Sequence, residues 1–253
     1  MRRLSMVDIH CHLIPGVDDG PQTMEAAIAL CRECVADGIT HAICTSHIHL
    51  GRYNNSLTSL IKPFSQLQRE LSLRQIDLKL GLSAEVRLDV SILQLLQNGE
   101  IPLMNVRKGE TVNPYILLEL PDAQIPLGAD KLVKKLMDMN ITPIIAHPER
   151  NKELIRDLAR VLPFLSQGCK LQITAGSLIG QFGSVIENVA WQLLESGYVI
   201  AVASDAHNLN GRSPKMAEAR HVIQSRLGEK MAETLTFLRP SQLFEEFNAD
   251  LYA

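Results

Sequence analysis

Histidine and acidic residues follow most of the short apolar segments of this chain, in a spacing that suits metal coordination. The clearest case is His10-Cys11-His12, which follows the apolar run Met6–Ile9 and precedes Asp18-Asp19-Gly20. Residues two apart on an extended strand point to the same side, so His10 and His12 can face one ion. The other candidates, in chain order, are His47, His49, Glu85, Glu119, His147, Asp205 and His207.

These side chains offer imidazole nitrogen and carboxylate oxygen without thiolate, a donor set that suits Mn²⁺, Fe²⁺ or Zn²⁺. A carboxylate such as Glu85 can bridge two ions, and neighbouring ions can activate water and neutralise a phosphoryl group. Of the eight histidines, only His41, at the start of a predicted strand, and His221, in a late helical segment, stand outside this pattern. We assign those two surface or structural roles and predict a metal-dependent hydrolase.

The elements that must position these residues alternate between short apolar runs and longer amphipathic segments. The runs are typical of buried parallel strands. They are Met6–Ile9, His41–Thr45, Leu78–Ser83, Tyr115–Leu120, Thr142–Ala146, Lys170–Thr174 and Tyr198–Ala203. The helical candidates between them are 22–37, 55–73, 89–98, 128–139, 151–167, 182–196 and 213–226.

Seven successive β–α units predict an α/β fold with a parallel sheet, most simply a distorted (β/α)7 barrel of the triosephosphate-isomerase type. In such barrels the active site lies at the carboxyl ends of the strands, where the candidate residues fall. An open doubly wound sheet is the alternative, although the chain lacks the GxGxxG fingerprint of its dinucleotide-binding version.

Composition narrows the class of protein. The net charge of −3 argues against a dedicated nucleic-acid binder, which needs a basic surface. An uninterrupted apolar run of about 18 residues is absent, and the basic N-terminus lacks the apolar core of a signal peptide. We therefore expect a cytoplasmic protein without membrane insertion, whose translation starts at Met1 or at Met6.

Five cysteines give an odd number, which argues against a disulfide framework. Cys31 and Cys34 form a CxxC on a helical pattern, but no second pair accompanies them, so we interpret them as ordinary helix residues. Arginine does not stand six positions after any cysteine. This excludes the C-x5-R loop of phosphatases that use a thiolate nucleophile.

At the motifs described above the chain resembles the PHP (polymerase and histidinol phosphatase) superfamily. The motifs are D-I-H-C-H-L-I-P-G-V-D-D-G (Asp8 to Gly20), A-H-P-E-R (Ala146–Arg150) and S-D-A-H (Ser204–His207). D-D-G and H-P-E-R point to one branch, the bacterial protein-tyrosine phosphatases of capsule and exopolysaccharide operons. The similarity runs from about Val7 to about Arg212, and Ser46 stands where the family usually has a proline.

The resemblance implies a single PHP-type barrel domain over residues 1–253, with 228–253 as C-terminal helices packed outside. It also implies three metal ions, commonly manganese. The first would be held by His10, His12, Glu85 and Asp205, the second by Glu85, Glu119 and His147, and the third by Asp19, His47 and His207.

Arg150 and Arg212 are predicted to bind the phosphate, because guanidinium groups match phosphate oxygens with two parallel hydrogen bonds. His49, two residues after His47, is a candidate general acid or supporting residue. Asp18 is expected to turn its loop or to orient a ligand.

The activity implied is hydrolysis of phosphotyrosine on a bacterial tyrosine kinase by metal-activated hydroxide, without a cysteine nucleophile. A small-molecule phosphatase of the histidinol-phosphatase type would share the site and differ in its pocket. A non-catalytic, metal-stabilised module is a further alternative, although such modules usually lose ligands. An amidohydrolase-like barrel is disfavoured because no lysine stands just past a central strand.

Overall fold

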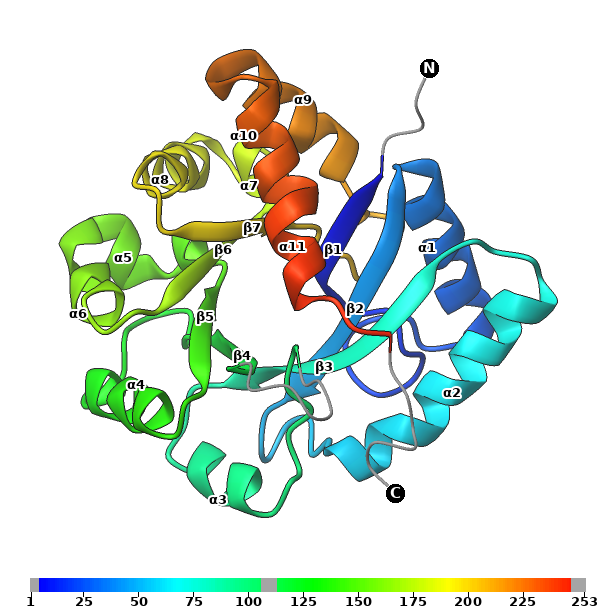
Figure 1. The fold of residues 1–253 in the computed structure, drawn as a ribbon, viewed down its shortest axis with the longest axis horizontal. Coiled ribbons are helices and arrows are strands. Elements are labelled where there is room, and N and C mark those ends of the chain that lie inside the picture. The colour runs from blue at the N-terminus through cyan, green and yellow to red at the C-terminus, as the bar shows by residue number, and fades with distance from the viewer. Residues whose placement is uncertain (1–4, 106–112, 247–253) are drawn as a thin grey trace.

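Seven parallel strands stand side by side in chain order and form a nearly closed barrel, with helices around it (Figure 1). The computed structural model describes residues 5–105 and 113–246. Met1 and the end of the predicted tail, 247–253, lie outside these ranges. The strands are β1 (Met6–Cys11), β2 (Ile39–Ile48), β3 (Lys79–Arg87), β4 (Tyr115–Glu119), β5 (Thr142–Ala146), β6 (Lys170–Thr174) and β7 (Val199–Ala203).

The register of the strands brings their carboxyl ends to one level. β2 and β3 pair over eight residues, which places His47 directly opposite Glu85. Within the described residues, the end of β1 is joined to the segment just past β7 by an isolated bridge, Cys11 to Ala206. The predicted distorted (β/α)7 barrel is therefore confirmed, with its seam between the first and last strands.

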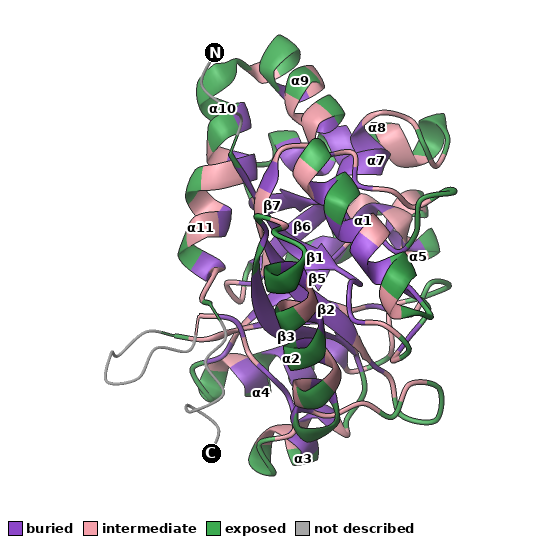
Figure 2. Ribbon diagram, turned by 90° about the vertical axis from the view of Figure 1, so that its right-hand side faces the viewer, coloured by how far each residue is buried: buried purple, intermediate pink, exposed green. Residues whose placement is uncertain are grey.

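Helices cover the outside of the barrel, and their outer surfaces are exposed while the strands are buried (Figure 2). Those that follow the first four strands are α1 (Met24–Ala36), α2 (Leu57–Leu73), α3 (Ile92–Gln97) and α4 (Ala129–Asp138). Those that follow the last three are α5 (Lys152–Arg156), α6 (Leu162–Leu165), α7 (Ala175–Leu178), α8 (Ser184–Glu195) and α9 (Met216–Leu227).

The single helix predicted over 151–167 is wrong. The chain there forms α5, a 3-10 helix η2 (Leu158–Val161) and α6. Asp157 adopts an extended conformation between α5 and η2, and its side chain accepts a hydrogen bond from the backbone N–H of Ala159. An aspartate that caps a new helical turn ends the preceding one. Pro163 then stands in the first turn of α6, where its missing N–H is not needed.

Apolar side chains fill the inside of the barrel below the level of the candidate residues. Leu117 and Glu119 lie two apart on β4 and therefore point to the same side, as Ile43 and His47 do on β2. The interior cluster comprises Val7, Ile9, Ile43, Met104, Leu117, Ile144, Ala146, Ala201, Ala203 and Leu243. A larger cluster lies between the strands and the surrounding helices. The candidate residues thus rest on an apolar floor.

The C-terminal segment closes the barrel at the end opposite the candidate residues. It forms α10 (Glu229–Glu233), the π-helical turn η3 (Thr234–Leu238) and α11 (Arg239–Leu243), which lies in front of β1 and β7 in Figure 1. The expectation of a tail packed only on the outside needs correction, because Leu243 belongs to the interior cluster. None of the helices in 5–105 and 113–246 is long and apolar enough to cross a membrane.

Candidate metal and phosphate site

Four buried side chains converge on one point at the carboxyl end of the barrel. His10 lies in β1, Glu85 in β3, and His12 and Asp205 follow β1 and β7. The Nε2 atom of His10 lies 3.2 Å from Glu85 Oε2 and 3.3 Å from Asp205 Oδ1. The Nε2 atom of His12 lies 3.3 Å from Glu85 Oε2 and 3.3 Å from His10 Nε2. These four residues are the predicted first ligand set.

Acceptors behind the imidazole rings fix which nitrogen faces this point. His10 Nδ1 lies 2.8 Å from Gln172 Oε1, and His12 Nδ1 lies 2.9 Å from Asp18 Oδ2. Each of these oxygens accepts the Nδ1–H, so the lone pair of each ring is on Nε2. Asp18 thus orients a candidate ligand, one of the two roles predicted for it, and it also accepts a hydrogen bond from the backbone N–H of Gly20.

A second group of candidate ligands surrounds Asp19, which is partly exposed to solvent. Asp19 Oδ1 lies 3.4 Å from His47 Nε2 and 3.4 Å from His207 Nε2. These are the three residues predicted to hold the third ion, and His12 lies close enough to join them. His207 Nδ1 donates to the backbone carbonyl of Asp205 at 2.9 Å, which again leaves Nε2 facing the group.

The remaining predicted ligands, Glu119 and His147, both lie close to Glu85. His147 Nε2 is 2.6 Å from Glu85 Oε1. Glu119 shares a possible coordination point with Glu85 and His47, whose Nδ1 atom lies 4.0 Å from Glu119 Oε2. Glu85 is thus the common neighbour of the other two residues in the predicted second set, Glu119 and His147. The residues whose ligand atoms all lie close to one another are Glu85, Glu119 and His47, however, and His147 is not among them.

Electrostatics at the site correspond to a buried negative centre. Burial alone would raise the pKa of Glu85 and of Asp205, but neighbouring histidines and arginines hold both well below their usual range. For Glu85 these are His10, His147 and His47; for Asp205 the largest contributor is Arg150. Buried carboxylates of this kind need a compensating cation.

The histidines respond to this centre in two ways. Burial would lower the pKa of His12, but the carboxylates of Asp18 and Glu85 raise it to about 10. Burial and then Arg150 lower the pKa of His147 to about 4, and burial and then His12 lower that of His207 to about 4. A ligand must be neutral, so a metal ion at this point would replace the proton that the carboxylates otherwise hold on His12.

Two arginines reach the site from different loops. Arg150 Nη2 lies 2.5 Å from Asp205 Oδ2, and Arg212 Nη2 lies 2.6 Å from the same oxygen. Arg150 is the last residue of the 3-10 helix η1 (Pro148–Arg150), which follows β5 directly. The structure therefore brings both predicted phosphate-binding arginines to one carboxylate beside the metal candidates.

His49 lies beside this group and is not oriented by it. Its ring makes no hydrogen bond or ion pair with residues in 5–105 and 113–246, whereas its backbone pairs with Tyr53. Burial, and then Arg87 and Arg52, lower its pKa. His49 lines a cleft of about 440 Å³ that also contains Asp19, Glu119, Arg150 and Arg212.

Sequence reasoning missed three residues that support the site. Gln172, in β6, accepts the hydrogen bond from His10 described above. Arg87 pairs with Glu119 through Nη1 and Oε2 at 3.1 Å. The Tyr53 ring stacks on His47 with centroids 5.3 Å apart. A signal existed for two of them: Gln172 is a polar residue in an apolar strand, and Arg87 shares a strand face with Glu85.

The backbone around the site is unusual at the positions that aim the ligands. His147 and Asp205 both have positive φ, 32° and 53°, just past their strands. Residues other than glycine rarely adopt this conformation, and such strain concentrates at functional sites. Gly20 is required for a different reason, because a Cβ there would lie 2.7 Å from the His12 carbonyl oxygen. Its absence lets the Asp18-Asp19 loop pack against His12.

Buried polar atoms of the candidate ligands that lack a hydrogen-bond partner show whether these residues suit metal ions. Asp205 Oδ1 and His207 Nε2 are buried and have no hydrogen-bond partner among the described residues. The facing Nε2 atoms of His10 and His12 cannot both donate to each other. Buried donors and acceptors are normally satisfied, so this convergence of lone pairs fits cations of the borderline or hard class.

Comparison with known proteins identifies relatives along most of the chain. The family model described as "Capsular polysaccharide synthesis, CpsB/CapC" matches residues 6–245. The tyrosine-protein phosphatase YwqE of Bacillus subtilis (strain 168) is 33% identical over 231 residues, which cover 91% of this chain and 89% of YwqE. The tyrosine-protein phosphatase CpsB of Streptococcus pneumoniae is 30% identical and covers 94% and 98%.

A solved structure agrees with these relatives. It comes from crystal structures of YwqE and CpsB, described as unique metal-dependent tyrosine phosphatases, and matches with a TM-score of 0.86 and 32% identity over 94% of each chain. The phosphotriesterase homology protein of Escherichia coli matches at 12% identity with a TM-score of 0.60, which shows a shared fold alone. This chain belongs to the CpsB/CapC family of capsular polysaccharide synthesis proteins.

Proposed function

We propose that this chain is a metal-dependent protein-tyrosine phosphatase that holds three divalent ions. The observation that carries the proposal is the convergence of Arg150 and Arg212 on Asp205, beside a buried cluster of imidazoles and carboxylates. Mn²⁺ is the ion we propose first, with Fe²⁺ and Zn²⁺ as alternatives. The proposed ligands are His10, His12, Asp19, His47, Glu85, Glu119, His147, Asp205 and His207.

The protein side chains have separable tasks in this reaction. Bound divalent ions would lower the pKa of water and polarise phosphoryl oxygens. Arg150 and Arg212 would bind the phosphoryl oxygens, because each guanidinium has five N–H donors and Asp205 occupies only part of them. Gln172 and Asp18 hold His10 and His12 in the ligating orientation. We propose that His49, which lines the cleft, gives a proton to the departing tyrosine oxygen.

Cysteine chemistry has no place in this site. All five cysteines are buried, and burial raises the pKa of Cys11, Cys31, Cys34 and Cys169. None of the five lines the cleft that contains the two arginines. A protonated, buried thiol is a poor nucleophile, so the nucleophile is water.

The proposed substrate is phosphotyrosine on a protein, in the first instance a bacterial tyrosine kinase linked to capsule or exopolysaccharide synthesis in the cytoplasm. The names of the relatives and the family description support this choice. The cleft, with a volume of about 440 Å³, also has room for a phosphotyrosine side chain. A small phosphate ester of the histidinol-phosphate type is the competing substrate.

One experiment tests both metal dependence and substrate class. Metal content is measured on the purified protein, and kcat/KM is compared for a phosphotyrosyl peptide and histidinol phosphate with added Mn²⁺. We expect bound metal and a clear preference for the peptide. Asp205→Asn should abolish hydrolysis, whereas His221→Asn, at an exposed position in α9, serves as the matched control. A preference for histidinol phosphate would overturn the proposed substrate, and an active Asp205→Asn enzyme would overturn the site.

A further inference from the structure

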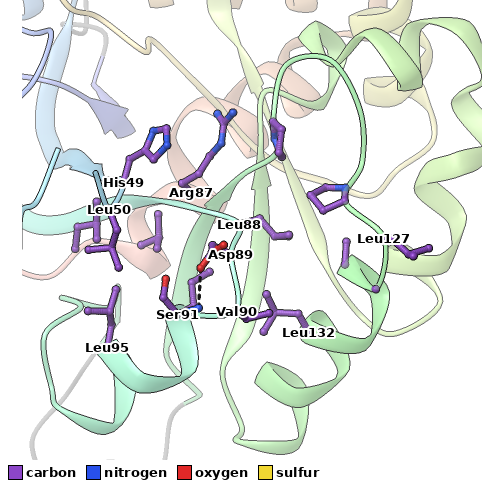
Figure 3. A pocket seen from close by; sticks show the side chains of 17 residues that line it. His49, Leu50, Arg87, Leu88, Asp89, Val90, Ser91, Leu95, Leu127 and Leu132 are labelled. Atoms are coloured by element: carbon purple, nitrogen blue, oxygen red, sulfur yellow. Dashed lines mark hydrogen bonds between the residues drawn. The ribbon is translucent and has the colours of Figure 1, made fainter. Parts of the chain in front are cut away.

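A second cavity opens directly beside the phosphate cleft. It has a volume of about 380 Å³ and lies where α3, α4 and the loops after β2, β3 and β4 meet. His49 and Arg87 line both this cavity and the cleft, so the two share a wall. Figure 3 shows His49 and Arg87 at the top of the view, with the labelled leucines spread from left to right below them. We call it the side pocket.

The two oppositely charged side chains that line the side pocket, Arg87 and Asp89, are already bound to other groups of the protein. Arg87 pairs with Glu119. Asp89 Oδ1 accepts a hydrogen bond from the backbone N–H of Ser91 at 2.8 Å, drawn in Figure 3. Apart from these two side chains and those of His49 and Ser91, the side chains that line the pocket are apolar and mostly aliphatic.

Those aliphatic surfaces continue from the floor of the side pocket to its rim. Leu95 and Leu132 are buried in the wall. At the rim Leu50 is 49% exposed, Val90 is 78% exposed and Leu127 is fully exposed. Single exposed apolar residues are common on proteins, but a group around one cavity marks a binding surface.

We propose that the side pocket binds an aliphatic side chain of the substrate polypeptide, within a few residues of the phosphotyrosine. The inference rests on the phosphatase function proposed above. Its support is the shared wall: a chain whose phosphate reaches Arg150 and Arg212 in the cleft must leave the cleft, and His49 and Arg87 separate it from an apolar cavity. The side pocket would then give sequence specificity that the metal and arginine cluster, which recognises phosphate, does not provide.

A peptide series measures this preference directly. Each peptide carries one phosphotyrosine in an alanine- and serine-containing sequence, with a single leucine placed at one of three positions on either side. With Mn²⁺ present, we expect kcat/KM to rise roughly tenfold over the leucine-free peptide at one or more positions, a size typical of one aliphatic group entering an apolar pocket.

Variants at the rim assign the preference to the side pocket. Leu127→Glu and Val90→Glu should reduce the ratio of leucine to leucine-free kcat/KM to about one, since a charge at the rim opposes an apolar ligand. Leu73→Glu, at an exposed leucine at the end of α2 and outside the side pocket, is the matched control and should keep the ratio. The ratio is taken within each protein, so differences in overall activity cancel.

The possible outcomes separate this inference from the proposed function. If the wild-type protein hydrolyses free phosphotyrosine but shows no leucine preference, or if Leu127→Glu and Val90→Glu keep the preference, the side-pocket proposal is wrong and the phosphatase proposal stands. If free phosphotyrosine is not hydrolysed, the proposed function itself fails. If the rim variants change the oligomeric state instead of the ratio, the side pocket is covered by a second copy of the chain, and the substrate proposal is overturned.

Discussion

Individual residues in this site are of two kinds: candidate metal ligands, and residues that hold those ligands in place. Gln172 is the clearest of the second kind. Its Oε1 atom lies 2.8 Å from His10 Nδ1, and both side chains are fully buried. Partners of this type fix the ring orientation and tautomer of a ligand and usually affect metal affinity by 10- to 100-fold.

Replacing Gln172 should therefore weaken metal binding. Gln172→Leu removes the acceptor behind His10, and we expect Mn²⁺ affinity to fall roughly tenfold or more. Gln172→Glu keeps an acceptor oxygen at the same place and should retain much more of the affinity. Titration of metal-free protein with Mn²⁺ measures both, with the melting temperature as a check on folding. Equal losses in the two variants would show that the acceptor is unimportant.

His49 can be tested as a proton donor by varying the leaving group. Tyrosine leaves as a phenolate whose conjugate acid has a pKa of about 10, so its departure benefits from protonation. We expect His49→Gln to lower kcat on phosphotyrosine by about 100-fold. On an aryl phosphate with a strongly acidic phenol as the leaving group, the loss should be severalfold at most. Equal losses on both substrates would instead indicate that His49 has a supporting or structural role.

At the scale of elements, the apolar runs predicted the seven strands well because each is buried on both faces. Thr142–Ala146 and Lys170–Thr174 were located without error. β2 and β3 extend several residues beyond their predicted ends, because His47 and Glu85 continue the strands as polar residues that face the site. The nine ligand candidates remain predictions; most of them lie in or just past the ends of strands, which is why the sequence pattern singles them out.

What could not be predicted depends on contacts between distant residues. Gln172 meets His10 across 162 positions of the chain, and no local pattern encodes that contact. The short helix α7 was also missed, because its first turn is held by Glu149, a residue from a different part of the chain. Glu149 Oε1 accepts hydrogen bonds from the Thr174 backbone N–H and from the Ser177 hydroxyl. Tertiary contacts of this kind override the local propensity of a short segment.

The contact between the C-terminal segment and β3 gives an element-scale prediction. A Cβ at Gly81 would lie 2.8 Å from the backbone carbonyl oxygen of Glu245, so Gly81→Ala forces the two segments apart. We expect a loss of about 1–3 kcal/mol in the free energy of unfolding, as for other overpacked positions. Gly211→Ala, where an added Cβ meets open space, should change it little. Urea denaturation compares the two; similar values would mean that the segment moves aside without loss.

For the whole molecule, the proposed catalytic centre is also a concentration of unfavourable charge. Glu85 and Asp205 are almost fully buried at the seam and centre of the barrel, and they are surrounded by histidines that must be neutral to bind metal. A protein folded around such a centre is stabilised by whatever cation occupies it. Activity and global stability should therefore depend on the same ions.

Removal of metal tests this coupling. At a free metal concentration about 100 times Kd, one bound ion adds about 2.7 kcal/mol to the free energy of unfolding. For a chain of this size that corresponds to a fall in Tm of roughly 5–10 °C on chelation. Chelated protein should lose phosphatase activity together with this stability, and Mn²⁺ should restore both. Alkylation with iodoacetamide should leave activity intact, because the five cysteines are buried. Activity that survives thorough chelation would contradict the metal mechanism, whereas lost activity with an unchanged Tm would contradict only the coupling to stability.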